Sequence, residues 1–150
     1  MNPSRAASFG EPAPAAMTDP STIELREGLD GLTPGRIATL YRRAPLLRPT
    51  DQPGRLMEAF RNSQLVIAAW SGDRLLGLAR VLTDGAQVSY LCDLAVEPDV
   101  QGSGLGKRLI EAVMERCTGT ELVLRDSNLS SGFYAHLGFE PIDNGWSRKG

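Results

Sequence analysis

The stretch from Val88 to Cys117 constrains the fold most, because it joins a long apolar run to an amphipathic helix through a glycine-rich turn. Residues 88–96, VSYLCDLAV, are nearly all apolar, as a strand in the centre of a sheet should be. Pro98 ends this run. Apolar residues then recur at helical spacing, which predicts a helix that begins near Ser103 or Gly104 and buries one face. Its apolar stripe consists of Leu105, Leu109, Val113 and Cys117, with Ile110 and Met114 beside them.

Turn and cap residues predict the elements that precede this stretch. Residues 21–26 are a short β-prone run, and Thr33-Pro34 gives an N-cap followed by proline at the first helical position. A second helix is expected to begin near Thr50 or Asp51. Residues 65–70 and 75–82 predict two strands joined by a tight turn. Asp84-Gly85 is a hairpin signal that leads into the strand over residues 88–96.

The C-terminal part predicts more strands and one more helix. Gly119 is the expected C-cap of the amphipathic helix, and residues 121–124 form a fifth strand. A short helix over residues 127–137 stops at Gly138, and residues 139–142 and 146–148 form a terminal hairpin. Residues 21–150 should therefore be a single α/β domain, with a mixed, mostly antiparallel sheet of six to seven strands flanked by about four helices. Residues 1–20, rich in Pro, Ala and Ser, are expected to be a disordered tail.

The composition excludes several classes of function. The net charge is −2 and the basic residues are scattered, so we expect no nucleic-acid partner. No apolar run approaches the roughly 18 residues of a membrane span, and the N-terminus resembles no signal peptide, so we expect no membrane partner and a cytoplasmic protein. Two cysteines and one histidine favour neither a disulfide framework nor a metal site.

The segment Gln101–Lys107, QGSGLGK, places three glycines between a strand and a helix. Glycine lets the backbone turn tightly and lets a ligand approach closely. The N-terminus of the helix adds unpaired N–H groups and the positive end of its dipole, so we expect a phosphate to bind there. A glycine-rich turn without a ligand is the alternative.

Two better-known phosphate motifs do not fit this segment. A P-loop requires a glycine where Gln101 stands and a Ser or Thr where Arg108 stands. A dinucleotide-binding fingerprint that starts at Gly102 and Gly104 requires its third glycine at Lys107. Neither a P-loop nor a dinucleotide-binding loop is therefore expected.

The segment Gln101–Gly106 instead matches the Q/R-x-x-G-x-G/A signature of the GNAT superfamily of N-acetyltransferases. The match continues upstream through Asp93–Pro98, and the residues Gly132–Phe139, GFYAHLGF, resemble the family's second signature, FYxxLGF. The expected order of elements over residues 21–150 is similar to the fold of that family. The resemblance implies an enzyme that moves an acetyl group from acetyl-CoA to a primary amine, by direct transfer in a ternary complex.

The resemblance also implies how the co-substrate is held. In that family the pantetheine arm lies against the fourth strand where it splays from the fifth, and the glycine loop holds the pyrophosphate. Asn128 resembles an asparagine that family members use beside the cofactor, although a helix cap is the alternative. Lys107 and Arg108 could add charge near the phosphates, or could simply form a solvated helix face. The implied residues are Leu94, Ala95 and Val96 for the pantetheine, and Gln101, Gly102, Ser103, Gly104, Leu105, Gly106 and Lys107 for the pyrophosphate.

Tyr134 occupies the position at which the family often has its general acid, beside the cofactor. A phenol near the sulfur can give a proton to the thiolate that leaves when an amine attacks the thioester. The alternative is an aromatic side chain that packs in the core, which is how we interpret Phe133.

The general base is harder to assign. Many relatives have a Glu on the fourth strand at the position of Cys92. Asp93 is the candidate here, with Glu97 as another nearby carboxylate, although Asp93 could serve only to satisfy buried backbone groups. A water relay or a side chain from the acceptor site is equally open. Cys92 as an acyl-carrying nucleophile is disfavoured, because no histidine is near it in the sequence.

The acceptor should be recognised by the two helices between the first and second strands and by the terminal hairpin. We expect the amine of a small molecule and a monomeric or homodimeric protein. A protein or peptide N-acetyltransferase and a non-catalytic acyl-CoA sensor are the alternatives. The candidate acceptor-side residues are Tyr41, Arg42, Arg43, Arg48 and Trp70.

Overall fold

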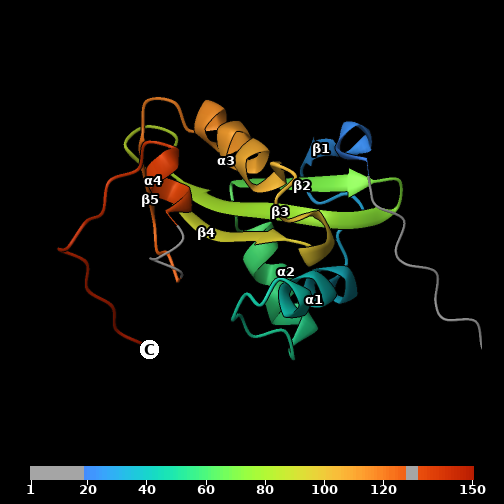
Figure 1. The fold of residues 1–150 in the computed structure, drawn as a ribbon. Coiled ribbons are helices and arrows are strands. Elements are labelled where there is room, and N and C mark those ends of the chain that lie inside the picture. The colour runs from blue at the N-terminus through green and yellow to red at the C-terminus, as the bar shows by residue number, and fades with distance from the viewer. Residues whose placement is uncertain (1–18, 128–131) are drawn as a thin grey trace, which may run out of the picture.

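The structure, a computed structural model, describes residues 19–127 and 132–150. These form one α/β domain in which a five-stranded sheet lies between helices (Figure 1). The strands are β1 (Glu24–Glu27), β2 (Leu65–Ser71), β3 (Arg74–Thr83), β4 (Val88–Val96) and β5 (Glu121–Leu124). The helices are α1 (Pro34–Arg43), α2 (Pro53–Arg61), α3 (Leu105–Arg116) and α4 (Phe133–His136), with short 3₁₀ turns η1 (Pro20–Thr22) and η2 (Pro98–Val100).

The strands lie side by side in the order of the sequence, β1-β2-β3-β4-β5. The first four are antiparallel neighbours, and β5 is parallel to β4 because α3 carries the chain back between them. Helix α3 covers one face of the sheet, and α1 and α2 cover the other (Figure 1). Both faces of the central strands are therefore buried, as their continuous apolar sequences require.

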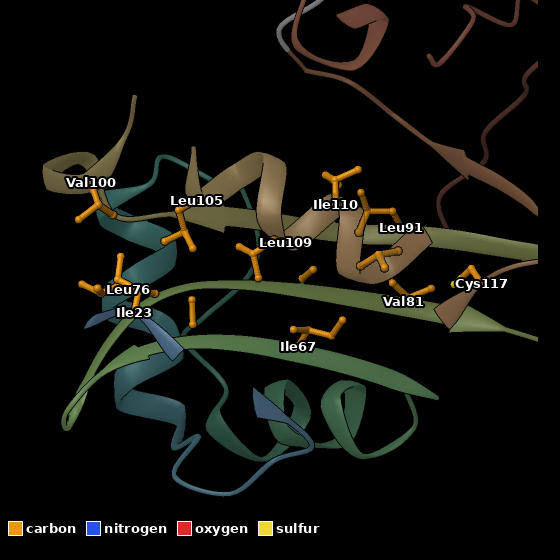
Figure 2. Close-up of a cluster of buried hydrophobic side chains, with 13 residues drawn as sticks. Ile23, Ile67, Leu76, Val81, Leu91, Val100, Leu105, Leu109, Ile110 and Cys117 are labelled. Carbon is orange, nitrogen blue, oxygen red and sulfur yellow. The ribbon is translucent and has the colours of Figure 1, made fainter. Parts of the chain in front are cut away.

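Two apolar cores hold these layers together. On the α3 face, Leu105, Leu109 and Ile110 of the helix lie over β2, β3 and β4, as Figure 2 shows. On the opposite face, Tyr41 of α1 and Phe60 of α2 pack against the sheet. Each fully buried side chain of this size contributes roughly 1.5–3 kcal/mol. The predicted stripe of α3 is confirmed by the burial of Leu105, Leu109, Ile110, Val113 and Cys117, whereas Met114, predicted beside it, is 42% exposed.

The sheet has fewer strands than the six to seven that we expect from the sequence. Residues 139–150, predicted as a hairpin, contain no strand, and the chain runs away from the sheet after α4 (Figure 1). Ile142 is 58% exposed and Trp146 is 99% exposed. A two-stranded hairpin is marginal unless it packs on other elements, and the exposure of these two apolar side chains shows that neither is buried against the domain. The turn signal alone therefore gave the wrong prediction.

Smaller differences concern the ends of elements. Residues 20–22 form η1 rather than the start of a strand, and α2 begins at Pro53, slightly later than expected. Helix α3 is capped at Cys117, so Gly119 lies in the turn beyond it, with φ +85°. Helix α4 begins only after Gly132, whose φ of +69° is left-handed and incompatible with a helix running through it. No helix within residues 19–127 and 132–150 has the length and hydropathy to cross a membrane.

Gly77 of β3 lies where α3 and β4 both come close to it. A Cβ added at this position would lie 3.0 Å from the carbonyl oxygen of Ala95 and 3.1 Å from Cδ1 of Leu109. We therefore expect Gly77→Val to lower the free energy of unfolding by about 1–3 kcal/mol through overpacking. Urea denaturation would measure this. Gly35→Ala, where nothing lies within 4 Å of the added Cβ, is the matched control, and equal midpoints for the two variants would contradict the packing argument.

Candidate active site

A β-bulge in β4 sets the geometry of the site. Arg80 pairs with Asp93 but Val81 pairs with Leu91, so Cys92 is an extra residue in β4. One extra residue shifts the alternation of side chains along a strand. The bulge therefore brings Asp93 to the face that α1 covers, while Leu91 and Leu94 contribute to the core under α3.

Asp93 is 2% exposed and accepts hydrogen bonds from three side chains. Tyr41 Oη and Arg80 Nε donate to Oδ2, at 2.8 Å and 2.6 Å, and Arg48 Nε donates to Oδ1 at 2.6 Å. A buried carboxylate is tolerated only when it is paired in this way. The three donors occupy three of the roughly four lone-pair sites of the carboxylate, and both lone pairs of Oδ2 are among them. The assignment of Asp93 as general base stays a prediction, and this geometry weighs against it.

Glu97 is held in the same manner at the end of β4. It is 5% exposed, and Arg43 Nε lies 2.8 Å from each of its carboxylate oxygens. Arg43 also reaches Asp99 at 3.5 Å, and Arg74 lies 2.7 Å from that residue. The last turn of α1 is therefore fixed to β4 by ion pairs, and Arg43 faces this network rather than an acceptor.

Tyr41 and Trp70, predicted to line the acceptor side, are both buried, at 1% and 2% exposure. Burial raises the pKa of Tyr41, and the negative charge of Asp93 adds to that effect. Trp70 lies under two guanidinium groups, those of Arg26 and Arg36, at 5.8 Å and 5.5 Å from the ring centroid. Trp70 thus belongs to the framework and lies on β2, away from the bulge, whereas Tyr41 is buried but also contributes to the wall of the cavity described below.

The strand β4 has an open edge beyond the bulge. Its pairing with β5 covers only Val88–Leu91, whereas its pairing with β3 continues to Val96. The N–H of Glu97 donates to Leu76 of β3 at 2.8 Å. Because successive residues of a strand direct their backbone groups to opposite edges, those of Ala95 also face β3. Those of Leu94 and Val96 face the open side.

The glycine loop follows directly after this open edge. Gly102 and Gly104 have φ of +84° and +86°, and no atom lies within 4 Å of a Cβ added at either. The first N–H of α3 that finds a helical partner is that of Arg108, bonded to Gly104 at 3.0 Å. The N–H of Gln101 already donates to Pro98 and that of Ser103 to Val100, at 3.3 Å and 3.2 Å, so the amides left for an anion are those of Gly102 and of residues 104–107. The Gln101 side chain donates to the Val96 carbonyl at 3.2 Å and closes the loop onto the strand.

The two basic residues after the loop have different surroundings. Arg108 Nη2 donates to the Ile23 carbonyl at 3.0 Å, so its guanidinium holds the segment before β1. Lys107 lies on the exposed face of α3, 3.7 Å from Glu111. Only Lys107 stays a candidate for charge near a phosphate.

Helix α4 brings the second sequence motif to the glycine loop. The Phe133 ring lies 3.3 Å from the position of a Cβ at Gly106, so α4 packs against the first turn of α3. Tyr134 makes edge-to-face contacts with the rings of Phe133 and Phe139, at centroid distances of 5.0 Å and 5.6 Å. Burial, with a smaller effect of the Asp126 charge, raises the pKa of Tyr134 to about 12. Asn128 lies outside the described residues.

Cys92 is half-buried in the bulge. Its thiol donates to the Tyr90 carbonyl at 3.7 Å, and burial raises the pKa of the thiol. The thiolate needed for nucleophilic attack is therefore disfavoured, in line with the expectation that Cys92 carries no acyl group. Within residues 19–127 and 132–150, no three His, Cys, Asp or Glu side chains lie together as a metal would require.

A shallow cavity of about 510 Å³, wide open to solvent, lies next to this network, between the last turn of α1 and the loop that follows it. The sequence pointed to Tyr41, Arg42 and Arg48, but it missed the apolar part of the wall. The signal that could have identified this wall is the proline-bounded apolar run of residues 45–49, PLLRP. The lining consists of Tyr41, Arg42, Pro45, Leu46, Leu47, Arg48 and Pro49.

Comparison with known families matches residues 49–150 to the model described as an acetyltransferase (GNAT) domain. The chain is 34% identical over 112 residues to histone acetyltransferase TAP1 of Glycine max. This alignment covers 65% of this chain and 48% of that protein. It is 30% identical over 122 residues to serotonin N-acetyltransferase 2, chloroplastic, of Oryza sativa subsp. japonica, covering 77% of this chain and 60% of that protein. The chain thus spans about half the length of the curated relatives it matches.

Solved structures have the same fold. A GNAT-family acetyltransferase from Streptococcus pneumoniae superimposes with a TM-score of 0.71 at 23% identity, covering 85% of this chain and 99% of that chain. An aminoglycoside acetyltransferase from a soil metagenomic sample gives a TM-score of 0.65 at 16% identity, covering 87% and 99%. At this identity the likeness concerns the fold alone.

The Asp93 network gives a test of stability. We expect Asp93→Asn to lower the free energy of unfolding by about 3–5 kcal/mol, because it leaves two guanidinium groups without their buried counter-charge. Asp99→Asn is the matched control, since Asp99 also pairs with two arginines but its side chain is 38% exposed. For this control we expect a change within about 0.5 kcal/mol. Urea denaturation of both variants would measure the difference, and similar losses would refute the role of Asp93 as a buried anchor.

Proposed function

The chain belongs to the GNAT acetyltransferase family, and on that premise we propose that it transfers an acetyl group from acetyl-CoA to the primary amine of a small molecule, by direct transfer in a ternary complex. One observation carries this proposal. This observation is that an open strand edge, a glycine loop with several unpaired amides and a half-buried tyrosine, Tyr134, meet where α4 packs on the start of α3.

The residues present fit coenzyme A. Beyond the bulge, the backbone groups of Leu94 and the N–H of Val96 face the open edge of β4, which suits the amides of an extended pantetheine chain, while the Val96 carbonyl accepts from Gln101. We leave Ala95 out of this set, because its backbone groups face β3. The amides of Gly102, Gly104, Leu105 and Gly106 suit the pyrophosphate, because the positive φ at Gly102 and Gly104 favours glycine, which leaves the loop free of side chains there. Acetyl-CoA supplies the activated acetyl thioester.

Tyr134 is proposed as the proton donor to the departing sulfur. With its pKa raised to about 12, the phenol is protonated at every pH below that value, so it holds a proton under all ordinary assay conditions. A group whose neutral form is stabilised by burial is suited to act as an acid rather than as a base.

No dedicated base is proposed. Both carboxylates at the end of β4, Asp93 and Glu97, are engaged by arginines. We therefore propose that the acceptor ammonium loses its proton through water before it attacks. An amine with an unperturbed pKa of about 10.4 is mostly protonated at neutral pH, so the rate should rise with pH as the neutral amine becomes available.

A protein acceptor is the second candidate, because one relative is named a histone acetyltransferase. The cavity beside the bulge argues against it. Its lining contains two arginines and no carboxylate, and a lysine-rich peptide would meet like charge there. The cytoplasmic location stays a prediction, and two of the related plant proteins are named chloroplastic.

Gly104→Val tests the phosphate loop. A β-branched residue at φ +86° is strained and places methyl groups in the loop, so we expect the affinity for CoA to fall at least about tenfold, which is ~1.4 kcal/mol. Calorimetric titration with CoA, below the melting temperatures of both proteins, would measure this. Gly85→Val carries a similar strain at φ +71° in the hairpin before β4 and should bind CoA normally. Equal affinities in the two variants would remove the loop from the proposal.

Tyr134→Phe tests the acid. The kcat for CoA release should fall by about 100-fold or more, while the affinity for CoA changes little, because only the proton donor is lost. Since the phenol of Tyr134 keeps its proton up to about pH 12, the wild-type profile should show no alkaline loss from this group below about pH 10. Tyr90→Phe, a half-buried tyrosine of β4, is the control. An unchanged kcat for Tyr134→Phe would rule out the assignment.

A further inference from the structure

The cavity beside the bulge combines an apolar wall with positive charge. Four of its lining residues are prolines or leucines on the loop after α1, namely Pro45, Leu46, Leu47 and Pro49. Arg42 and Arg48 supply two guanidinium groups, and no carboxylate lines it. A ligand that fits this site has an apolar body and a negative charge.

Arg48 is held in one position before any ligand binds. Its Nε donates to Asp93 at 2.6 Å and its Nη2 donates to the Cys92 carbonyl at 2.7 Å. A guanidinium has five N–H donors, and among the described residues these two bonds use two of them. The side chain is 42% exposed, so donors are left for a ligand. A fixed guanidinium binds a carboxylate with little loss of side-chain entropy.

The place where Arg48 touches β4 limits the distance between charge and amine. It binds the carbonyl of Cys92, two residues before Leu94, where the open edge is proposed to receive the pantetheine. An acceptor carboxylate at Arg48 therefore lies close to the thioester, and its amine must be close to that carboxylate. The amine and the carboxylate of the acceptor are closest together when both are attached to the same carbon atom, as in an α-amino acid.

We infer that the acceptor is an α-amino acid with an apolar side chain, whose carboxylate pairs with Arg48 and whose side chain occupies the cavity. This rests on the proposed acetyltransferase function. A polyamine would bring positive charge against two guanidinium groups. An arylalkylamine would fill the apolar part but leave the donors of Arg48 desolvated and unpaired.

The experiment compares acceptors that differ only in the carboxylate. CoA release would be followed with leucine, leucinamide and isoamylamine, with phenylalanine, phenylalaninamide and phenethylamine, and with spermidine. The free acids should have a kcat/KM about 10- to 100-fold higher than the amides, as expected for a hydrogen-bonded charge pair. The ratio of acid to amide is the readout, because damage to the fold lowers both values together.

Variants of the arginines then test which residue causes the preference for acids over amides. Arg42→Gln should reduce the ratio of acid to amide several-fold without disturbing Asp93, and Arg48→Gln should abolish it. Arg61→Gln is the matched control, because Arg61 is exposed at the end of α2 and does not line the cavity. This control should keep the wild-type ratio.

The possible results distinguish a failure of the amino-acid assignment from a failure of the proposed acetyltransferase function. If an amide, an arylalkylamine or spermidine is the best acceptor, the chain is an acetyltransferase but the amino-acid assignment is wrong. If the acids are preferred but Arg48→Gln leaves the ratio unchanged, Arg48 is not the carboxylate site and the inference fails. If CoA binds and no amine gives CoA release, the proposed function fails and the inference fails with it.

Discussion

The buried carboxylate of Asp93 connects helix α1, the loop after α1 and strand β3 to strand β4 through hydrogen bonds. Asp93 lies on β4 and accepts hydrogen bonds from Tyr41 of α1, from Arg48 of the loop after α1 and from Arg80 of β3. Buried ion pairs add little net stability compared with apolar packing, but they tolerate few alternative arrangements, because a partner that moves away leaves a charge uncompensated. The loop that lines the cavity is fixed to the bulge of β4 for this reason.

The bulge and the short pairing of β5 act together. The bulge turns Asp93 toward α1, and the early end of the β4–β5 ladder leaves the next residues of the strand with one open edge. Helix α3 starts just after that edge, so backbone donors of two kinds, from a strand and from a helix terminus, face the same region. The position of the candidate site thus follows from backbone geometry more than from the chemistry of any one side chain.

The sequence predicted what depends on local pattern. The apolar stripe of α3, the cap at Thr33 and the central strands are set by residues close together in the chain, and the structure contains them. The partners of Asp93 lie 13 to 52 residues away along the chain, so no local pattern could identify them. The prediction of a terminal hairpin was wrong for a related reason. A turn signal at Asn144 specifies a bend, whereas a strand also needs a surface for Ile142 and Trp146.

The open edge of β4 also has a consequence for association between molecules. An unpaired strand edge can add a strand from another chain and so begin aggregation. Here Arg48 takes the carbonyl of Cys92 and Gln101 takes that of Val96, so acceptors that a foreign strand would need are already occupied. The Gln101 contact is made by an exposed side chain, which can move aside for a small ligand more easily than a backbone can. The two residues that border the site thereby protect the uncovered strand from edge-to-edge pairing.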